Sequence, residues 1–382
     1  MAADAPDDPI TAAPPPGAPV RPPSRRAAIT AALAGIGVLG LTAAVAAPRP
    51  GWLREAGGDA ELGTALAPHL REHRRVAAVL READGTHRTA GFGADENTAF
   101  EIGSLTKTFT GALLMEGAAR GELTLGSTVA EVLGTQAEGS PIADVRLDEL
   151  ASHTSGLPRL PAAMTLPSIG ANLLRRDPYR GWSPQDVVDA ALTAEPSGRG
   201  EEAYSNLGVA LLGQLLARAA GTTWQELLDA RLLAPLRLSA SSAPVTAAQL
   251  PADAPRGRTA AGLPAQPWAM DGFAPAGGMR STIADMGRWL ESMVSGTNPG
   301  AAGLDPISTP AEEGGSSTAV VWVRSPLPDG AGEMIWHNGM TGGFSSFCGW
   351  LPETGRGVVL LSDTARSLDE LAAGVLTGAV AA

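Results

Sequence analysis

The chain has 382 residues, of which 44% are hydrophobic, and it carries a formal net charge of −12 at pH 7. This length suffices for a sizeable core in one large domain or two modest ones, and the acidic balance argues against nucleic acid as a partner. The single cysteine, Cys348, excludes an intramolecular disulfide framework, and five scattered histidines have no metal-ligand spacing, so neither a metal nor another cofactor is expected.

The N-terminal region is predicted to consist of a disordered segment followed by a segment that directs the chain to the membrane. Residues 1–24 are rich in Pro, Ala and Asp, a composition typical of disorder. Arg25 and Arg26 precede an uncharged run that is about one bilayer thick as a helix and ends in small residues typical of a cleavage site. We therefore predict a signal peptide or signal-anchor helix over residues 25–47, with a buried helix as the least favoured alternative. The arginines favour a cytoplasmic N-terminus, so the remainder would be extracytoplasmic, secreted or anchored, and would meet the membrane only through this segment.

The next part of the chain is predicted to form a helix and a hairpin. Residues 59–74 carry leucines on one stripe, with Asp59 as a suitable N-cap, although Pro68 sits awkwardly inside this helix. Two strands joined by an Asp-Gly turn are predicted at residues 76–80 and 86–92.

Helical patterns fill the middle of the chain, and strand patterns return towards its end. Helices are predicted from Ser104 and over residues 184–193, 207–219, 224–233 and 281–293. Strands are predicted at residues 318–323, 334–336, 344–351 and 357–361, and a helix over 367–376 closes the chain.

This order of elements predicts an α/β fold in which one sheet is built from both ends of the chain and a mainly helical region is inserted. We assign residues 58–382 to one domain, with 58–155 and 265–382 as its α/β part and 156–264 as the helical insert. A cleft between two such parts is a usual place for a small-molecule site.

One short stretch combines a serine with the only lysine of the chain. The sequence has 28 basic residues, and subtracting Lys107 leaves 27 arginines. A buried lysine, unlike an arginine, can lose its proton and act as a base. Ser104 lies three residues earlier, so the two side chains share one face of a helix that begins here. The alternative interpretation is an ordinary N-cap serine and a surface lysine.

A second polar group, Tyr204-Ser205-Asn206, stands directly before the helix predicted from residue 207. A tyrosine hydroxyl can relay a proton, and an asparagine side chain can hold both a catalytic amine and a substrate amide. The alternative interpretation is a simple turn with Asn206 as the N-cap.

A third group, the glycine-rich stretch that begins at His337, lies between two predicted strands. Glycines such as Gly339 allow the backbone to approach a ligand closely. The N–H of Met340 would pair with that of Ser104 to form an oxyanion hole. The alternative is a plain glycine-rich turn. His153, in a polar turn elsewhere, is interpreted as structural.

Together these motifs resemble those of the serine β-lactamase and penicillin-binding-protein superfamily, in its class C-like branch. The nucleophile motif, the Tyr-x-Asn motif and the Lys-Thr-Gly position correspond to Ser104-x-x-Lys107, Tyr204-x-Asn206 and His337-Asn338-Gly339. The resemblance covers about residues 58–380 and implies an antiparallel sheet flanked by helices.

The resemblance also implies a mechanism. Ser104 would attack a carbonyl carbon and form an acyl-enzyme, with Lys107 and Tyr204 as acid and base in an order left open. The backbone N–H groups of Ser104 and Met340 would hold the oxyanion. The substrate-binding residues would be Asn206, His337, Gly339 and Met340.

Position 337 departs from the pattern, because it is a permanent cation in class C β-lactamases and a histidine is largely neutral near pH 7. The predicted function is an exported serine hydrolase of the β-lactamase or D-peptidase type. Its substrate would be a small molecule: a β-lactam, a D-amino-acid peptide or an ester. The alternatives are an esterase on the same scaffold and a non-hydrolytic sensor of cell-wall fragments; the oligomeric state is left open.

Overall fold

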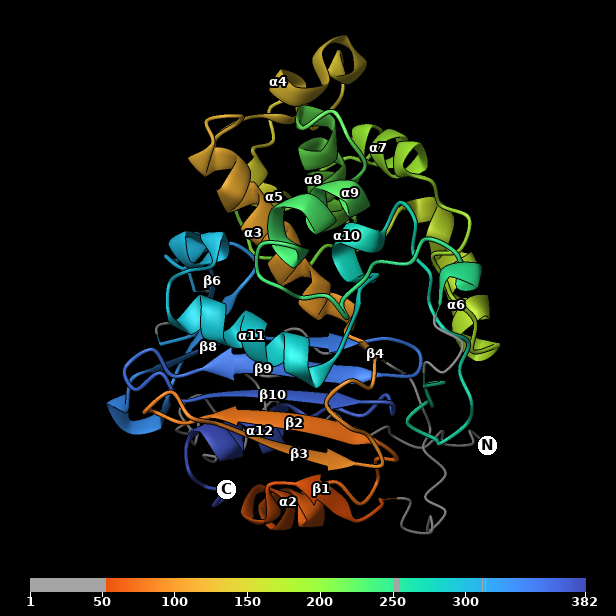
Figure 1. The fold of residues 1–382 in the computed structure, drawn as a ribbon. Helices are drawn as coiled ribbons and strands as arrows, with labels where there is room; N and C mark the ends of the chain where they lie inside the picture. Colours follow the sequence, from red (N-terminus) through yellow and green to blue (C-terminus); the bar gives the residue numbers. More distant parts are fainter. Residues whose placement is uncertain (1–52, 251–254, 311, 313) are drawn as a thin grey trace, which may run out of the picture. The chain divides into compact units, whose positions relative to one another are not determined.

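An eight-stranded sheet forms one layer of the fold (Figure 1). The computed structural model describes residues 53–250, 255–310, 312 and 314–382. The strands follow one another across the sheet in the order β1, β3, β2, β10, β9, β8, β7, β6, and every neighbouring pair is antiparallel. Their bounds are Ala56–Gly58 (β1), Val76–Arg81 (β2), His87–Phe92 (β3), Ser317–Thr318 (β6), Val323–Pro326 (β7), Glu333–Met340 (β8), Ser345–Trp350 (β9) and Gly357–Ser362 (β10).

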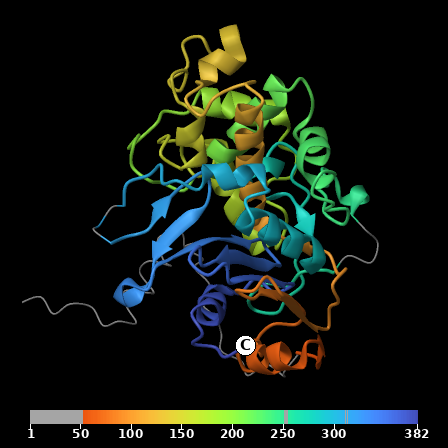
Figure 2. The same cartoon turned by 60° about the vertical axis from the view of Figure 1, so that its left-hand side comes forward.

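The central strands β2 and β10 are covered on both faces of the sheet. Every residue of β10 is buried, and so is every residue of β2 except Arg81. Helix α11 (Ile283–Val294) lies on one face, whereas α2 (Ala60–Leu66) and α12 (Asp369–Leu376) lie on the other, as both views show (Figures 1 and 2). A strand that is covered on both faces needs a continuous run of apolar residues rather than an alternating pattern. Both β2 and β10 have such a continuous run.

The sheet joins the two ends of the folded chain, since β2 pairs directly with β10. The predicted α/β fold, with an antiparallel sheet and an inserted helical region, is confirmed. The helical region lies between β4 (Phe100–Glu101) and β5 (Arg280–Ser281), which pair with each other in a separate two-stranded sheet. Its α-helices are Thr106–Ala119 (α3), Val129–Leu133 (α4), Leu147–Ala151 (α5), Thr165–Leu173 (α6), Pro184–Leu192 (α7), Asn206–Ala219 (α8), Trp224–Leu228 (α9) and Ala274–Gly277 (α10).

Helix α3 is the centre of the helical region. All residues from Thr106 to Leu114 are buried, so the helix has no solvent-facing side over its first turns. The ring of Phe109 stacks on Trp289 of α11, with ring centroids 3.7 Å apart. Helices α8 and α10 also pack against α3. These contacts fix the N-terminal end of α3 at the boundary with the sheet.

The predicted helix over residues 59–74 is shorter in the structure. It stops at Leu66 and is followed by a 3₁₀ turn, Ala67–His69, because Pro68 has no N–H with which to continue the helix. The predicted cap is confirmed, since the carboxylate of Asp59 accepts a backbone hydrogen bond of 2.8 Å.

The predicted strand over residues 318–323 is wrong in its middle. Ala319 and Trp322 close a turn between β6 and β7, with a 2.8 Å hydrogen bond from the N–H of the first to the carbonyl of the second. The N–H of Val321 bonds to the carbonyl of Ala151, so this backbone leaves the ladder to bind another segment. Val321 also has a φ of 61°, which no strand residue adopts.

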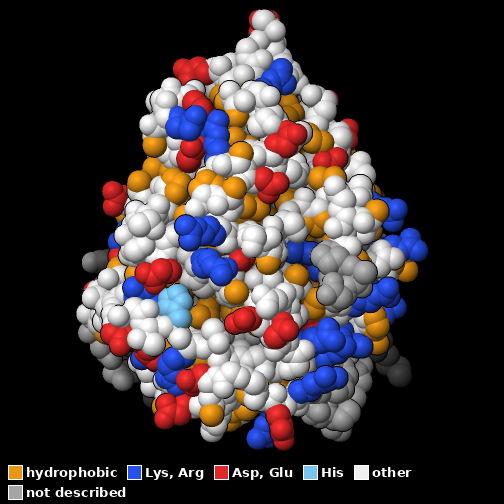
Figure 3. Space-filling view, in the orientation of Figure 1, with side chains coloured by type: hydrophobic (Ala, Val, Ile, Leu, Met, Phe, Trp, Pro, Cys, Tyr) orange, Lys and Arg blue, Asp and Glu red, His pale blue; other side chains and the backbone are white. Residues whose placement is uncertain are grey.

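The surface carries both signs of charge. On the face drawn in Figure 3, acidic and basic side chains are interspersed over most of the area. One apolar feature stands out on α6, where Leu166, Ile169 and Leu173 are exposed by 79%, 55% and 78%. The predicted disordered segment and the predicted signal or anchor segment lie outside the described residues. Within the described ranges, no helix has the length and apolar character needed to cross a membrane.

Candidate active site

The three residues predicted to be catalytic meet at the start of α3. Ser104 lies in a 3₁₀ turn, Gly103–Leu105, immediately before the helix, and its side chain is partly exposed. Its Oγ accepts hydrogen bonds from Lys107 Nζ at 3.0 Å and from the hydroxyl of Tyr204 at 2.6 Å. A hydroxyl that substrate can reach is therefore held by an amine and a phenol.

Lys107 is fully buried behind the serine. Its Nζ also donates to the carbonyl of Ala276 at 2.5 Å, and it forms no ion pair with a carboxylate among the described residues. Burial lowers the pKa of Lys107 well below its usual range, and the positive charge of Arg159 lowers it further. Burial thus favours the neutral amine, the form that can accept a proton.

His153 helps to position Tyr204, through its ring and through a hydrogen bond to the next residue along the chain. The ring of His153 packs on the tyrosine ring with centroids 4.5 Å apart. His153 has a φ of 62°, and its Nδ1 accepts a 3.2 Å hydrogen bond from the N–H of Ser205, in agreement with a structural role in the turn. Ser205, rather than Asn206, is the N-cap of α8. Burial raises the pKa of Tyr204, so its hydroxyl stays protonated at neutral pH.

Asn206 makes a different contact from the expected one. Its Nδ2 donates to the hydroxyl of Tyr179 at 2.9 Å rather than bonding to Lys107. Its Oδ1 is buried and has no partner among the described residues, so its capacity to accept a hydrogen bond is unused. Tyr179 is buried, which raises its pKa to about 12. No motif indicated Tyr179, although its rarity is a signal, because the chain has only two tyrosines.

Two glycines allow the serine turn to lie directly against strand β8. A Cβ on Gly103 would stand 2.8 Å from the N of Met340, and one on Gly339 would stand 2.0 Å from the carbonyl oxygen of Ile102 and 2.9 Å from the N of Ser104. Gly103 also has a φ of 51°, which glycine adopts most easily. The backbone of the serine turn and that of β8 therefore touch without intervening side chains.

The hydrogen-bond alternation along β8 directs one N–H towards this contact. Just beyond the two strands, the N–H of Thr341 donates to the carbonyl of Phe344 at 3.0 Å. By the alternation of an antiparallel ladder, the adjacent pair, Met340 and Ser345, is then expected not to exchange hydrogen bonds. The N–H of Met340 thus points away from β9, to the side where Gly103 lies. This arrangement suits an oxyanion hole built with the N–H of Ser104.

We expect Gly339→Ala to slow acylation about 10²- to 10³-fold, the usual cost of disturbing one oxyanion donor. The added methyl group would meet the carbonyl oxygen of Ile102 and the N of Ser104, both in the segment of the serine turn, so β8 would have to move away from Ser104. The measurement is the single-turnover acylation rate. Gly170→Ala on α6 is the control, because a Cβ there meets nothing within 4 Å. A rate within about threefold of the wild-type value would contradict the proposed hole.

His337 is buried on β8, two residues before Gly339. Its side chain is 2% exposed, its Nδ1 donates to the carbonyl of Asn338 at 2.6 Å, and its Nε2 has no partner among the described residues. Burial, the larger cause, and the nearness of the Lys107 amine lower the pKa of His337 to about 3. The imidazole is therefore neutral across the physiological range and supplies no permanent positive charge.

A buried ion pair links the serine motif to the glycine-rich strand. Glu101 and Arg280 are 3% and 2% exposed, and their closest atoms are 2.6 Å apart. The carboxylate also accepts hydrogen bonds from the hydroxyl of Thr341 at 2.6 Å and from the N–H of Trp268 at 3.0 Å. Burial raises the pKa of Glu101 against the opposing effect of Arg280. The sequence assigned no role to Glu101, because its partners lie far away along the chain.

Arg280→Met should lower the free energy of unfolding by about 3–5 kcal/mol, because it leaves a carboxylate buried without its partner. Denaturant unfolding followed by tryptophan fluorescence measures this. The matched control is Arg120→Met, whose side chain is 57% exposed and forms only surface ion pairs, so that its loss costs about 1 kcal/mol or less. Equal effects of the two substitutions would show that the buried pair does not hold the motifs together.

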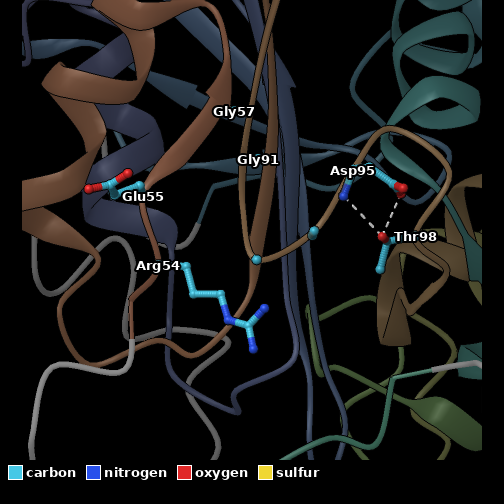
Figure 4. Close-up of a pocket in the computed structure, with 8 residues that line it drawn as sticks. Arg54, Glu55, Gly57, Gly91, Asp95 and Thr98 are labelled. Carbon is cyan, nitrogen blue, oxygen red and sulfur yellow. Dashed lines mark hydrogen bonds between the residues drawn. The ribbon is translucent and has the colours of Figure 1, made fainter.

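A separate shallow pocket lies at the edge of the sheet (Figure 4). Arg54, Glu55, Asp95 and Thr98 line it together with glycines of β1 and β3. The carboxylate of Asp95 is already engaged by the hydroxyl of Thr98 at 2.7 Å. The pocket shares no residue with the Ser104 cluster, and we assign it no role. No group of three or more His, Cys, Asp or Glu among the described residues is placed to hold a metal ion.

A serine hydroxyl held between a buried amine and a phenol, at a turn packed directly against a strand backbone, is an arrangement typical of a serine hydrolase. The chain matches the Beta-lactamase family over residues 27–381 and belongs to that family. The predicted resemblance to the serine β-lactamase and penicillin-binding-protein superfamily is thereby confirmed. The protein is a serine hydrolase of the β-lactamase type.

Individual relatives agree with this assignment. A β-lactamase of Escherichia coli (strain K12) is 26% identical over 306 residues, which cover 70% of this chain and 76% of the relative. Penicillin-binding protein 4 of Amycolatopsis lactamdurans is 30% identical over 168 residues, covering 41% of this chain and 39% of that protein. The crystal structure of a class C β-lactamase from Rhodobacter sphaeroides superimposes with a TM-score of 0.69 at 19% identity, covering 85% of this chain and all of that one.

Proposed function

We propose that the protein is an exported acyl hydrolase in which Ser104 is the nucleophile, Lys107 the base and Tyr204 the acid of acylation. The observation that carries this proposal is the pair of contacts to one oxygen: Ser104 Oγ lies 3.0 Å from Lys107 Nζ and 2.6 Å from the hydroxyl of Tyr204. The directions of the two pKa shifts support the division of roles. Burial favours a neutral Lys107, which can take a proton, and a protonated Tyr204, which can give one.

In acylation, Ser104 Oγ attacks the carbonyl carbon of the substrate while Lys107 Nζ takes the hydroxyl proton. The negative charge that develops on the carbonyl oxygen is held by the N–H groups of Ser104 and Met340. The tetrahedral intermediate then collapses, Tyr204 protonates the departing group, and Lys107 returns its proton to Tyr204. The product of this stage is an ester between Ser104 and the acyl group of the substrate.

In deacylation, a water molecule attacks the acyl-enzyme carbonyl and its proton goes to Lys107, either directly or through the hydroxyl of Tyr204, which accepts it as it passes its own proton to the amine. The same two N–H groups stabilise the oxyanion, and Ser104 leaves with a proton returned to it. The free Oδ1 of Asn206 is suited to accept a hydrogen bond from an amide of the bound acyl group. Substrates of this chemistry are β-lactams, D-amino-acid peptides and esters.

One observation favours an esterase activity as the second candidate. His337, which stands where class C enzymes carry a permanent cation, is buried and neutral, with a pKa of about 3. A neutral ester does not need that cation, whereas a substrate with a carboxylate would lose a charge-assisted contact there.

The experiment is to offer a fluorescent penicillin, a chromogenic cephalosporin and a short-chain nitrophenyl ester to the wild-type protein and to Ser104→Ala. Ser104-dependent turnover of the lactam indicates a β-lactamase, and turnover of the ester alone indicates an esterase. Stable labelling of Ser104 without turnover would instead indicate a sensor. The absence of any Ser104-dependent reaction would overturn the proposal.

We also propose that residues 25–47 direct export of the domain. The basis is the arginine pair followed by an uncharged run of membrane-spanning length. Protease added to intact cells or spheroplasts should degrade a membrane-retained enzyme, or the activity should appear outside the cytoplasm if the segment is cleaved. Activity confined to the cytoplasm would contradict export.

A further inference from the structure

Neither of the two basic side chains in the three motifs supplies a permanent positive charge to the site. Lys107 is buried with its pKa well below the usual range, and His337 is buried with a pKa of about 3. Lys107 and His337 are 0% and 2% exposed, and burial disfavours the charged form of each, so neither offers an accessible cation to the carboxylate of a substrate. Any such contact must come from elsewhere in the chain.

Arg159 is an exposed arginine beside the catalytic tyrosine. Its guanidinium carbon lies 5.0 Å from the centroid of the Tyr204 ring. Arg159 forms no ion pair with any carboxylate in the part of the chain that the structure describes. An arginine packed against an aromatic face and open to solvent keeps its planar set of donors available.

The backbone of Arg159 is bound to the start of α8, which fixes the point from which the side chain extends. Its carbonyl accepts hydrogen bonds from the N–H of Asn206 at 3.1 Å and from that of Leu207 at 3.2 Å. These bonds join Arg159 to the helix that follows Tyr204. Because they use only the backbone, they survive substitution of the side chain.

The charge of Arg159 reaches the catalytic groups. It lowers the pKa of Lys107, and it also opposes the rise that burial causes in the pKa of Tyr204. The guanidinium carbon of Arg159 lies 5.0 Å from the centroid of the Tyr204 ring, and the hydroxyl of that ring lies 2.6 Å from Ser104 Oγ, so Arg159 is near enough to act on a substrate bound at Ser104. In the proposed mechanism the hydroxyl of Tyr204 protonates the leaving group. The leaving group must therefore lie beside Tyr204.

We propose that Arg159 forms a carboxylate subsite at the mouth of the active site, so that preferred substrates carry a free carboxylate on their leaving group. This inference rests on the proposed function, because it places the leaving group beside Tyr204. The guanidinium supplies a two-pronged contact to a carboxylate. The subsite replaces the cation missing at position 337 by one from a different segment of the chain.

The test uses the full-length protein and two aryl esters of the same acylglycine. One ester has a carboxylate in the meta position of the leaving phenol, and the other has an uncharged carboxamide there. The quantity measured is the ratio of kcat/KM for the charged ester to kcat/KM for the neutral one. This ratio cancels any effect of Arg159 on the pKa of Lys107 or Tyr204, since both esters share those groups.

Arg159→Gln should lower the ratio about tenfold or more, the size of one partly exposed charge-assisted contact. Arg159→Lys should retain part of it, because the charge remains and the planar fork is lost. Arg71→Gln is the matched control: this residue is exposed in the turn before β2, forms no ion pair with a described residue, and changes the net charge equally.

The outcomes separate the two proposals. A ratio that is the same in Arg159→Gln as in the wild type, with both esters turned over and the fold confirmed by circular dichroism, overturns the subsite alone. Equal losses in Arg159→Gln and Arg71→Gln also overturn it, since they would reflect net charge only. Failure of the wild type to hydrolyse either ester through Ser104 overturns the proposed function, and the subsite falls with it.

Discussion

Ser104→Ala should abolish covalent labelling by penicillins and activated esters and lower kcat/KM on the order of 10⁵-fold or more. The hydroxyl is the one atom that both Lys107 and Tyr204 contact, so removing it leaves the base and the acid with nothing to activate. The residual rate would come from substrate binding and the backbone N–H groups alone. Intact-protein mass spectrometry detects the acyl adduct, and peptide mapping locates it.

Ser295→Ala is the control for this substitution, because that serine is exposed at the end of α11, outside the site. It should label and turn over like the wild type. Ser104 is partly exposed in a turn, so Ser104→Ala should unfold at nearly the same temperature as the wild type. An adduct found on a residue other than Ser104 would show that the nucleophile has been misidentified.

Lys107→Arg and Lys107→Met should each lower the acylation rate about 10²- to 10⁴-fold, the usual contribution of a positioned base. Arginine keeps the positive charge but remains protonated, so conserving the charge should not restore the reaction. Lys107 is fully buried, and methionine keeps the apolar length of its side chain without a charge. Lys107→Met therefore tests the loss of the amine even if the arginine variant unfolds. Circular dichroism and the unfolding midpoint establish that each variant is folded.

The pH profile separates a base from a merely structural lysine. Only the neutral amine accepts the serine proton, so wild-type acylation should fall as the pH drops through the lowered pKa of Lys107 and stay high above it. The residual activity of Lys107→Met should lack this acidic limb. If Lys107→Arg kept more than about a tenth of the wild-type rate, Lys107 would not be the proton acceptor.

Features of local origin could be predicted from the chain alone. The spacing of Ser104 and Lys107 fixes their separation as soon as a helix forms, and they do contact each other. The apolar runs of β2 and β10 identify buried strands, and the cap at Asp59 was visible beside its helix. Each of these signals is contained within about one or two turns or one strand of the chain.

Features that join distant segments could not be predicted in this way. Asn206 bonds to Tyr179 rather than to Lys107, and Glu101 meets Arg280, because of how separate loops fold over the start of α3. The bend at Ala319–Trp322 arises because Val321 takes a partner outside the sheet.

The charges of the site residues also depend on the tertiary structure, although the residue types are given by the sequence. The sequence shows that position 337 departs from the expected cation, but the loss of charge on its histidine comes from burial and from the nearness of Lys107. No sequence signal distinguishes Arg159 from the other arginines of the chain, which number 27 (28 basic residues less one lysine). Only the tertiary structure shows that it packs against the ring of Tyr204. Residue spacing encodes helices, strands and caps over a few positions, whereas burial and charge proximity depend on segments brought together from across the chain, and these two quantities determine which groups carry a charge.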